Sequence, residues 1–369
     1  MHVGLNLVFL VPGETGGMEV AARALIPALR DAAPGVRFTA LVNREAAAVD
    51  FGVESVVVPV NATRRVEWVR GEQLLLPGLA RRAGCDLVHS LGSTAPSRGR
   101  FVRVTTIHDL NYLMVPDAHF GLRGLGMRVL VPLAARRSAR VIADSESTKR
   151  DLVERLRVEP VRIDIVPLGV SRPSDVVATP ADELRQRLAL GRRPMILSLS
   201  AKRPHKNLRG LLNALASMPA ERRPALVLPG YATPYEAELR EHAAAIGVDD
   251  DVRWLGWTSD ADVAGLLAVC AAFVFPSFYE GFGLPVLEAM AAGAPVACSD
   301  RSSLPEVAGD AALLFDPDAP VSIAAAIETI LGDCAEAERL RAAGRARAAL
   351  FTWRRTAELT LASYERAPA

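Results

Sequence analysis

Residues 279–288 read YEGFGLPVLE, and this stretch decides how the whole chain is interpreted. Glu280 and Glu288 flank a Gly-Phe-Gly turn, and Pro285 suits the first turn of a helix. The apolar run just before it, residues 272–275, predicts a buried strand. A helix that begins past the carboxyl end of a strand offers N–H groups that bind anions. The stretch therefore predicts a phosphate-sized anion site between two hydroxyl-binding carboxylates, which suits a sugar nucleotide.

A purely structural interpretation of this stretch stays open at this point. The two glycines could serve only to turn a strand into a helix, and Glu288 could stabilise the helix N-terminus through its dipole. Gly293 followed by Pro295 is typical of the end of that helix in either case. Spacing alone does not separate the two interpretations.

Outward from this stretch, short apolar runs alternate with longer stretches of helical spacing. This alternation is typical of parallel sheets joined by crossover helices, and nearly continuous apolar strands indicate that both sheet faces are covered. We therefore predict the α/β class. The predicted strands are residues 3–10, 37–42, 55–60, 86–89, 102–107, 140–144 and 164–167, then 195–200, 225–228, 252–255, 272–275, 295–297 and 312–315.

The length of 369 residues exceeds what one core usually supports, so two domains are expected. The segment 171–194 carries three prolines and is the best candidate for a linker between domains 1–170 and 195–351. Residues 352–369 predict an amphipathic helix capped by Thr352, which we expect to pack back onto the first domain.

Composition excludes several classes of protein. Lys plus Arg (43) nearly equals Asp plus Glu (42), so no overall charge draws the chain to nucleic acid. The four cysteines lack metal or disulfide spacing, and the apolar start lacks a basic region and breaks at Pro12, unlike a signal peptide. No apolar run reaches the ~20 residues of a membrane span. We expect a cytoplasmic protein.

The segment PSFYEGFGLPVLEAMAAGAPV, residues 276–296, resembles the Glu-x7-Glu signature of the retaining nucleotide-sugar glycosyltransferases of family four. The match continues into residues 252–277 and 299–320, and the resemblance covers essentially the whole chain. It implies the GT-B fold, with two Rossmann-like, doubly wound parallel-sheet domains facing across a cleft. It also implies a transferase that uses a nucleotide-sugar substrate and no cofactor, in bacterial glycan or natural-product biosynthesis.

Carried over position by position, the resemblance implies a role for each matching residue. Glu280 would contact the hydroxyls of the donor sugar as a catalytic residue, and Glu288 would bind the ribose. The stretch WLGW at 254–257 would contact the base through its backbone. The remaining donor-binding positions are the backbone amides of Phe282, Gly283 and Leu284 at the sugar and diphosphate, with Gly256 and Trp257 at the base.

A cationic partner for the diphosphate is expected, because negative charge develops there as the glycosidic bond breaks. Two of only three lysines, Lys202 and Lys206, lie with Arg203 in a basic run just after the strand at 195–200. Lys206 matches the family's catalytic lysine, whereas Ala201 stands where the family has an arginine. Either Lys202 or Arg203 must replace that arginine, and we favour Lys202. A solvated charge cluster is the alternative.

Two stretches predict the remaining site residues. Gly16 and Gly17 follow the first strand and match a glycine pair that approaches the donor phosphates or the acceptor, although a plain tight turn is equally compatible. His108, at the end of another strand, matches a catalytic position beside the donor sugar, where its imidazole or backbone would contact a hydroxyl near the reacting carbon. A single histidine is otherwise more often structural.

Other signals point to partners or are discounted. The basic stretch at 119–140, with Arg123, Arg128, Arg136, Arg137 and Arg140, could contact an anionic membrane at its inner face, or present a solvated arginine face on the acceptor domain. Aspartates 249–251 and the pair Asp316 and Asp318 resemble metal-binding motifs but suit turns, so no metal is expected.

Together these features predict transfer of a hexose-type sugar from GDP-mannose or a UDP-sugar to an acceptor hydroxyl, with retention of configuration. The acceptor would be a glycan, a lipid-linked intermediate or a small molecule. The alternatives are a nucleotide-sugar epimerase of the same fold and a non-catalytic protein that binds sugar nucleotides. A Rossmann oxidoreductase lacks its dinucleotide fingerprint here.

Overall fold

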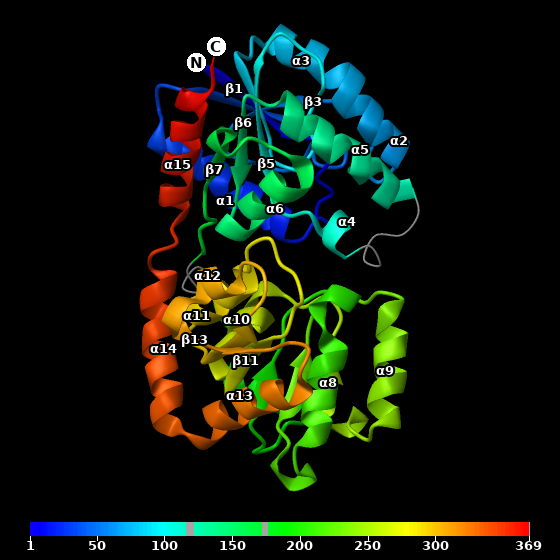
Figure 1. The fold of residues 1–369 in the computed structure, drawn as a ribbon, viewed down its shortest axis with the longest axis vertical. Coiled ribbons are helices and arrows are strands. Elements are labelled where there is room, and N and C mark those ends of the chain that lie inside the picture. The colour runs from blue at the N-terminus through cyan, green and yellow to red at the C-terminus, as the bar shows by residue number, and fades with distance from the viewer. Residues whose placement is uncertain (116–121, 172–175, 369) are drawn as a thin grey trace. The chain divides into compact units, whose positions relative to one another are not determined.

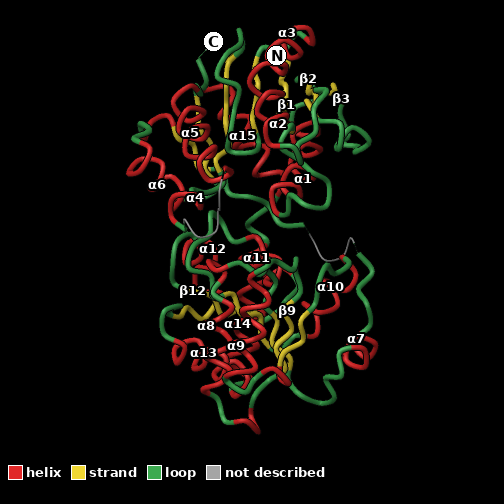
Figure 2. Tube along the Cα trace, turned by 90° about the vertical axis from the view of Figure 1, so that its right-hand side faces the viewer, coloured by secondary structure: helices red, strands yellow, loops and turns green. Residues whose placement is uncertain are grey.

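The structure, a computed structural model, describes residues 1–115, 122–171 and 176–368, with only the backbone of residues 122–125. The chain divides into two compact units, one of residues 1–169 with 351–369 and one of residues 170–350. Each unit is built around one parallel sheet, with its strands enclosed by helices (Figures 1 and 2). The α/β class is therefore confirmed.

The first unit contains a seven-stranded sheet in the order β3-β2-β1-β4-β5-β6-β7, and every neighbouring pair is parallel. Its strands are β1 (His2–Leu7), β2 (Arg37–Val42), β3 (Glu54–Val57), β4 (Leu87–Ser90), β5 (Val102–Ile107), β6 (Arg140–Ala143) and β7 (Ile163–Ile165). Its helices are α1 (Gly17–Ala32), α2 (Arg65–Arg70), a π-helix (Gly71–Leu75), α3 (Leu76–Ala83), α4 (Asn111–Met114), α5 (Leu122–Arg137), α6 (Glu146–Leu156) and α15 (Trp353–Arg366), with a 3-10 turn at Pro160–Arg162.

The second unit contains a six-stranded parallel sheet in the order β10-β9-β8-β11-β12-β13. Its strands are β8 (Met195–Leu197), β9 (Ala225–Leu228), β10 (Val252–Trp254), β11 (Ala272–Phe275), β12 (Val296–Ser299) and β13 (Ala312–Phe315). Its helices are α7 (Ala181–Arg187), α8 (Leu208–Ser217), α9 (Tyr235–Ala245), α10 (Asp260–Val269), α11 (Leu284–Ala291), α12 (Leu304–Ala308), α13 (Pro320–Gly332) and α14 (Cys334–Ala348), with 3-10 turns at Pro204–Lys206, Ala220–Arg222, Asp249–Asp251 and Gly309–Ala311.

All thirteen predicted strands are present, although several end earlier than their apolar runs. Strand β1 stops at Leu7 while Val8 and Leu10 stay buried in the following turn, and β8 stops at Leu197. Apolar residues continue past the last hydrogen-bonded position of the strand and are buried in the loop that follows. The apolar run is therefore longer than the strand. The carboxyl ends of the parallel strands lie at one edge of each sheet, where ligands bind in such folds.

Helix α15 and the later part of the predicted linker each pack within one unit. Helix α15, red in Figure 1, packs against α1 of the first unit, with Thr352 accepting a hydrogen bond from the Arg355 amide as its N-cap (3.1 Å). Residues from Thr179 onward pack on α10 in the second unit, where the Thr179 hydroxyl donates to Asp262 at 2.7 Å. The structure thus gives the later part of the predicted linker a place in the second unit.

Two features of the structure bear on contact with a membrane: the length and polarity of its helices, and the predicted basic stretch at 119–140. Among the described residues, no helix is both long enough and apolar enough to cross a bilayer. Of the predicted basic stretch, residues 116–121 lie outside the described residues, and so does the Arg123 side chain. Arg128, Arg136 and Arg137 are exposed, whereas Arg140 lies in β6 and pairs with Asp164, so Arg140 does not belong to the helix face.

Candidate active site

The loop between β11 and α11 is organised as an anion site would be. Helix α11 begins at Leu284 rather than at Pro285, because Gly283 takes a left-handed conformation (φ +117°) as its N-cap. A side chain at Gly283 would lie 2.8 Å from Leu304, so glycine also keeps this turn close to α12. The backbone N–H groups of Gly283 and Leu284 have no acceptor among the described residues.

Lys206 and Glu280 meet at the carboxyl edge of the second sheet. The Lys206 ammonium lies 2.6 Å from a Glu280 carboxylate oxygen, and only 17% and 12% of the two side chains are exposed. Lys206 follows β8 and Glu280 follows β11, and these strands are neighbours in the sheet. The same ammonium sits 5.3 Å from the centre of the Phe275 ring. The structure therefore brings together the two predicted catalytic residues of this unit.

Serine side chains fix the turn that carries Glu280. The Glu280 amide donates to the Ser302 hydroxyl (2.9 Å), and the Ser303 hydroxyl donates to the carbonyls of Glu280 (3.0 Å) and Phe282 (2.6 Å). Ser303 is fully buried. Sequence reasoning missed both serines; their only signal was the pair of hydroxyl residues just before α12. They hold the Glu280 backbone, so the carboxylate is free to point at the lysine.

Glu288 lies in the second turn of α11, because the helix starts one residue early. Its half-buried carboxylate forms no hydrogen bond or ion pair with any described residue. Burial raises the pKa of Glu288 to about 6, and the nearby Asp260 carboxylate adds to this. An unpaired carboxylate that is costly to ionise is available to accept hydrogen bonds from a ligand's hydroxyls.

Lys202 does not lie where the sequence favoured it. Its side chain is completely buried, and its ammonium donates to the carbonyls of Gly230 (2.6 Å) and Leu255. These two bonds hold the ammonium inside the protein, which argues against our preference for Lys202 as a phosphate ligand. Arg203 is half-buried and its guanidinium has no partner among the described residues, so Arg203 stays a candidate for the role of the family's arginine.

The loop after β10 exposes the predicted base-binding positions. Gly256 and Trp257 are both exposed, and 69% of the Trp257 surface is open to solvent. The Trp257 ring lies 5.0 Å from the ring of Tyr231 in the loop after β9, tilted by 34°. Tyr231 was not predicted, since the two loops are distant in sequence.

In the first unit, the glycine pair is open. Gly16 is the N-cap of α1 and has a positive φ of 64°. Gly16 and Gly17 are both exposed, and a Cβ added at either residue would have no neighbouring atom within 4 Å. The turn before them is tied down by Glu19, which accepts from the Gly13 amide at 2.8 Å. The start of α1 is therefore an accessible helix N-terminus at the carboxyl edge of the first sheet.

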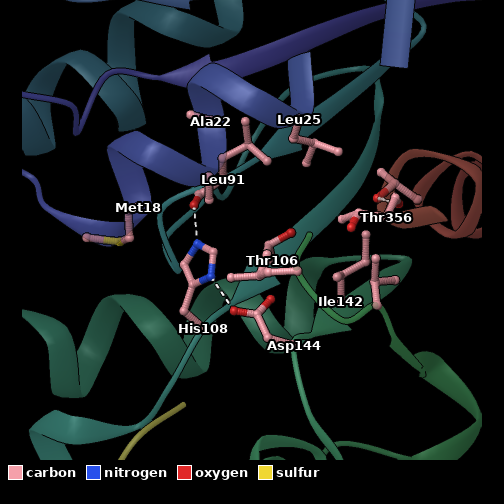
Figure 3. A pocket seen from close by; sticks show the side chains of 13 residues that line it. Met18, Ala22, Leu25, Leu91, Thr106, His108, Ile142, Asp144 and Thr356 are labelled. Atoms are coloured by element: carbon pink, nitrogen blue, oxygen red, sulfur yellow. Dashed lines mark hydrogen bonds and ion pairs between the residues drawn. The ribbon is translucent and has the colours of Figure 1, made fainter. Parts of the chain in front are cut away.

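His108 is bonded at every polar atom. Its Nδ1 lies 2.6 Å from Asp144 and its Nε2 donates to the Leu91 carbonyl at 2.9 Å (Figure 3). Its amide donates to the Ser93 hydroxyl at 3.4 Å, and its carbonyl accepts from Thr148 at 3.1 Å. No ring nitrogen is left for a sugar hydroxyl, which argues against the predicted contact through the imidazole.

The bonding pattern makes His108 a cation. An ionised carboxylate and a carbonyl both only accept, so with Asp144 ionised both ring nitrogens carry protons. Burial works against that charge, but the Asp144 carboxylate outweighs it and raises the pKa of His108 to about 9. The pocket that the pair lines is mostly apolar and measures about 10 Å³, which is barely enough for one water molecule. This pocket does not hold a sugar.

Three of the five discounted aspartates pair with arginines. Arg301 lies 2.9 Å from Asp316 and 3.1 Å from Asp318, while Asp251 pairs with Arg193 at 2.7 Å. Within the described part of the chain, no group of three or more His, Cys, Asp or Glu side chains is placed to hold a metal ion. Metal independence stays a prediction.

Comparisons with known proteins bear on the family of the chain. The model described as "Glycosyltransferase Family 4" matches residues 15–172, and the one described as "Glycosyl transferases group 1" matches residues 180–347. The O-antigen chain mannosyltransferase B of Escherichia coli is 34% identical over 71% of this chain and 70% of its own length. The serotype-specific mannosyltransferase WbdA of Escherichia coli is 31% identical over 71% of this chain, a region that spans only 33% of WbdA.

Among solved structures, HepE of Anabaena in complex with UDP and glucose superposes with a TM-score of 0.78. It covers 99% of each chain at 21% identity, and this likeness supports the GT-B fold. The two family models cover the two units in turn, and a curated relative above 30% identity aligns along most of its length. The chain belongs to the glycosyltransferases of family 4.

Proposed function

We propose that this glycosyltransferase moves a hexose-type sugar from a nucleotide sugar to an acceptor hydroxyl. Mannose is the sugar we propose first. The acceptor is a glycan, a lipid-linked intermediate or a small molecule. One observation carries the proposal. Lys206 and Glu280 form a largely buried pair at the edge of the second sheet, in the same loop system as the unpaired amides of Gly283 and Leu284. A cation, an anion and open donors in one place match the phosphate and hydroxyls of a nucleotide sugar.

In this proposal the donor diphosphate replaces Glu280 as the main partner of Lys206. The ammonium, the Arg203 guanidinium and the amides of Gly283 and Leu284 then surround the phosphate oxygens. Glu280, released from its ion pair, accepts hydrogen bonds from the sugar hydroxyls. The pair at 2.6 Å thus keeps both charges compensated until the donor binds.

We further propose that transfer proceeds with retention on one face of the sugar. The electron pair of the glycosidic carbon–oxygen bond moves to the phosphate oxygen, and the acceptor oxygen bonds to the anomeric carbon. The acceptor's proton passes to the departing phosphate. The protein's contribution is to position both substrates and to neutralise the leaving group. This needs no metal and no cofactor.

The positions of the other donor residues support the same orientation of the nucleotide. Glu288, with its unpaired carboxylate, would accept from the ribose hydroxyls. Gly256 and Trp257 follow β10, which stands three strands from β11, or about 14 Å at the usual strand spacing. The phosphates and the base would therefore lie three strands apart along one sheet edge.

Mannose as the transferred sugar is supported by the mannosyltransferase names of the relatives, and HepE, crystallised with UDP, supports testing UDP-sugars as well. The test is to incubate the purified protein with GDP-mannose, UDP-glucose or UDP-galactose and a panel of hydroxyl acceptors, with and without EDTA. Transfer with retained anomeric configuration, resolved by NMR and insensitive to EDTA, is expected. Conversion of a donor without any acceptor would instead show an epimerase.

A further inference from the structure

A broad groove crosses the amino ends of several strands of the first sheet. It is lined by residues at or just before the starts of β4, β5, β6 and β7, together with Arg366 and Pro368 at and beyond the end of α15, and it measures about 910 Å³. The ends labelled N and C in Figure 1 lie near this edge of the sheet. A volume of roughly 300–1,000 Å³ is usual for sites that bind small molecules. The groove is therefore large enough for such a ligand.

Positive charge is concentrated in this groove. Six of its lining residues are arginines: Arg100, Arg103, Arg137, Arg140, Arg162 and Arg366. Of the described residues that line it, Asp86 alone is acidic, and one further carboxylate, that of Asp164, pairs with two of the arginines. Six guanidiniums against two carboxylates leave an excess of four positive charges, although the whole chain carries a formal net charge of only +1. We call this feature the arginine groove.

Two of the arginines join neighbouring parts of the fold. Arg140, at the start of β6, donates two hydrogen bonds to Asp164 of β7 (2.8 and 2.5 Å). Arg162, in the 3-10 turn before β7, donates to the carbonyls of Ala135 (3.0 Å) and Ser138, at and just past the end of α5. These two guanidiniums have a structural role, and that role fixes their positions beside the groove.

Arg103, near the start of β5, is also held in place. Its guanidinium donates to the carbonyls of Pro96 (2.8 Å) and Gly99 (2.9 Å). It also lies 5.0 Å from the centre of the Phe101 ring. Gly99 has a φ of +130°, and a Cβ there would lie 2.3 Å from the same ring, so glycine keeps this turn tight. Only Nε and Nη2 of Arg103 are used in these bonds, so its Nη1 has no acceptor among the described residues.

Arg100 and Arg137 differ from these three, because neither guanidinium has a partner among the described residues. Both side chains are exposed, so neither holds another part of the protein in place. Arg137 also lies close enough to Arg103 for its charge to lower the pKa of Arg103, in addition to the larger effect of burial. Guanidiniums held close together repel each other, which costs stability. An anion bound in the groove would offset that repulsion.

We propose that the arginine groove is a second anion site of this protein, which binds a soluble compound with two or more phosphate groups. It belongs to the first unit, whereas the donor site is proposed in the second, and it does not rest on the proposed function. Guanidinium groups suit phosphate because two parallel N–H groups match two of its oxygens. Arg103 would contact the ligand from the sheet, and Arg100 and Arg137 from the exposed side. A single phosphate would leave most of the 910 Å³ unfilled, so several are expected.

An anionic lipid surface fits this groove less well. Surfaces that bind membranes combine basic residues with exposed apolar side chains that enter the lipid. Among the described residues that line the groove, no large apolar side chain is exposed, and Phe101 is buried. Guanidiniums in a concave groove are also harder for a flat surface to reach. The groove therefore favours a soluble anion.

The test is calorimetric titration of the protein with tripolyphosphate. All titrations use Lys206→Ala as the parent, so that the cation of the proposed donor site does not contribute. Adding Arg100→Gln and Arg137→Gln should weaken binding about 10- to 100-fold, the loss expected for charge-assisted hydrogen bonds. The matched control adds Arg98→Gln and Arg136→Gln, two exposed arginines nearby in sequence that do not line the groove, and it should bind as tightly as the parent. Equal affinities in the two double variants, or no binding by the parent, would overturn the proposal.

A second measurement needs no substitution. Hydrogen exchange of the wild-type protein should slow at residues 99–103 and 137–140 when tripolyphosphate is added, because the ligand orders the segments that contact it. Exchange that slows only in the second unit would place the anion elsewhere and overturn the groove as its site.

Vesicles separate a lipid headgroup from a soluble phosphate compound. Co-sedimentation with phosphatidylglycerol vesicles, compared with phosphatidylcholine vesicles, should be the same in the Arg100→Gln/Arg137→Gln protein as in its parent. Binding to phosphatidylglycerol that depends on these two arginines, with no binding of tripolyphosphate, would show a lipid-binding surface and overturn the assignment to a soluble compound.

Discussion

The carboxyl edges of both sheets carry charged side chains, but the two edges differ in how many of the polar atoms there are bonded within the protein. In the first unit, the charged histidine His108 has every polar atom bonded within the protein, including an ion pair with Asp144. In the second unit, Arg203, Glu288 and the amides at the start of α11 have no partner among the described residues. Groups already bonded shape a site, whereas unbonded groups can bind a ligand. The open groups of the second unit therefore support the proposal that the donor binds there.

The comparison predicts that Lys206→Ala has the largest effect. Removing the cation that faces the leaving diphosphate should lower kcat about 10²- to 10³-fold, as loss of one donor to a developing oxyanion does elsewhere. The measurement is steady-state kinetics with the preferred donor. Lys149→Ala, on α6 of the first unit, is the matched lysine control and should keep wild-type rates. Near-normal kcat in Lys206→Ala would contradict the assignment.

Asp144→Asn tests the other side of the comparison, the closed pair in the first unit. Since the folded pKa of His108 is raised to about 9 from 6.5, the stability from its charge is complete below pH 6.5 and lost as pH rises through 9. The wild type should lose up to about 3 kcal/mol of unfolding free energy over that range. Denaturant titrations at several pH values should show a flatter profile in Asp144→Asn; parallel profiles would refute the charged pair.

Arg203→Gln tests whether Arg203, rather than Lys202, takes the role of the family's arginine after β8. Loss of one charge-assisted hydrogen bond to phosphate should lower kcat/KM about 10- to 100-fold. Arg209→Gln, an exposed change on α8, provides the matched arginine control. Equal kcat/KM values in the two variants would show that Arg203 does not replace the family's arginine.

The smallest expected effect concerns Glu288. With a pKa of about 6, its carboxylate is ionised at pH 7 and protonated at pH 5, so it loses acceptor capacity for ribose hydroxyls on acidification. The donor KM should rise up to about tenfold between pH 7 and pH 5. Glu288→Gln should have a higher KM that no longer varies over this range. The same pH dependence in both proteins would exclude Glu288 as its source.

Much of the fold could be predicted because strand positions follow from apolar runs. The start of α11 was placed within one residue, since Gly283 and Pro285 mark it locally. The meeting of Lys206 and Glu280 could also be expected, as both follow strands at the same sheet edge.

The misses have a common cause, which is contact between segments distant in sequence. Whether Lys202 points to the phosphate or into the protein depends on Gly230 and Leu255, 28 and 53 residues away. The bond from Asp144 to His108 depends on β5 and β6 being neighbours. With the strand order known, the Asp at the end of residues 140–144 could have been found as the histidine's partner.

The most direct test of the account is a crystal structure of the protein with a bound nucleoside diphosphate. Its phosphate oxygens should lie within hydrogen-bonding distance of the Gly283 and Leu284 amides and the Lys206 ammonium, with Glu280 no longer paired to that lysine. Phosphates seated instead at the glycine pair that begins α1, with the lysine–glutamate pair unbroken, would contradict it.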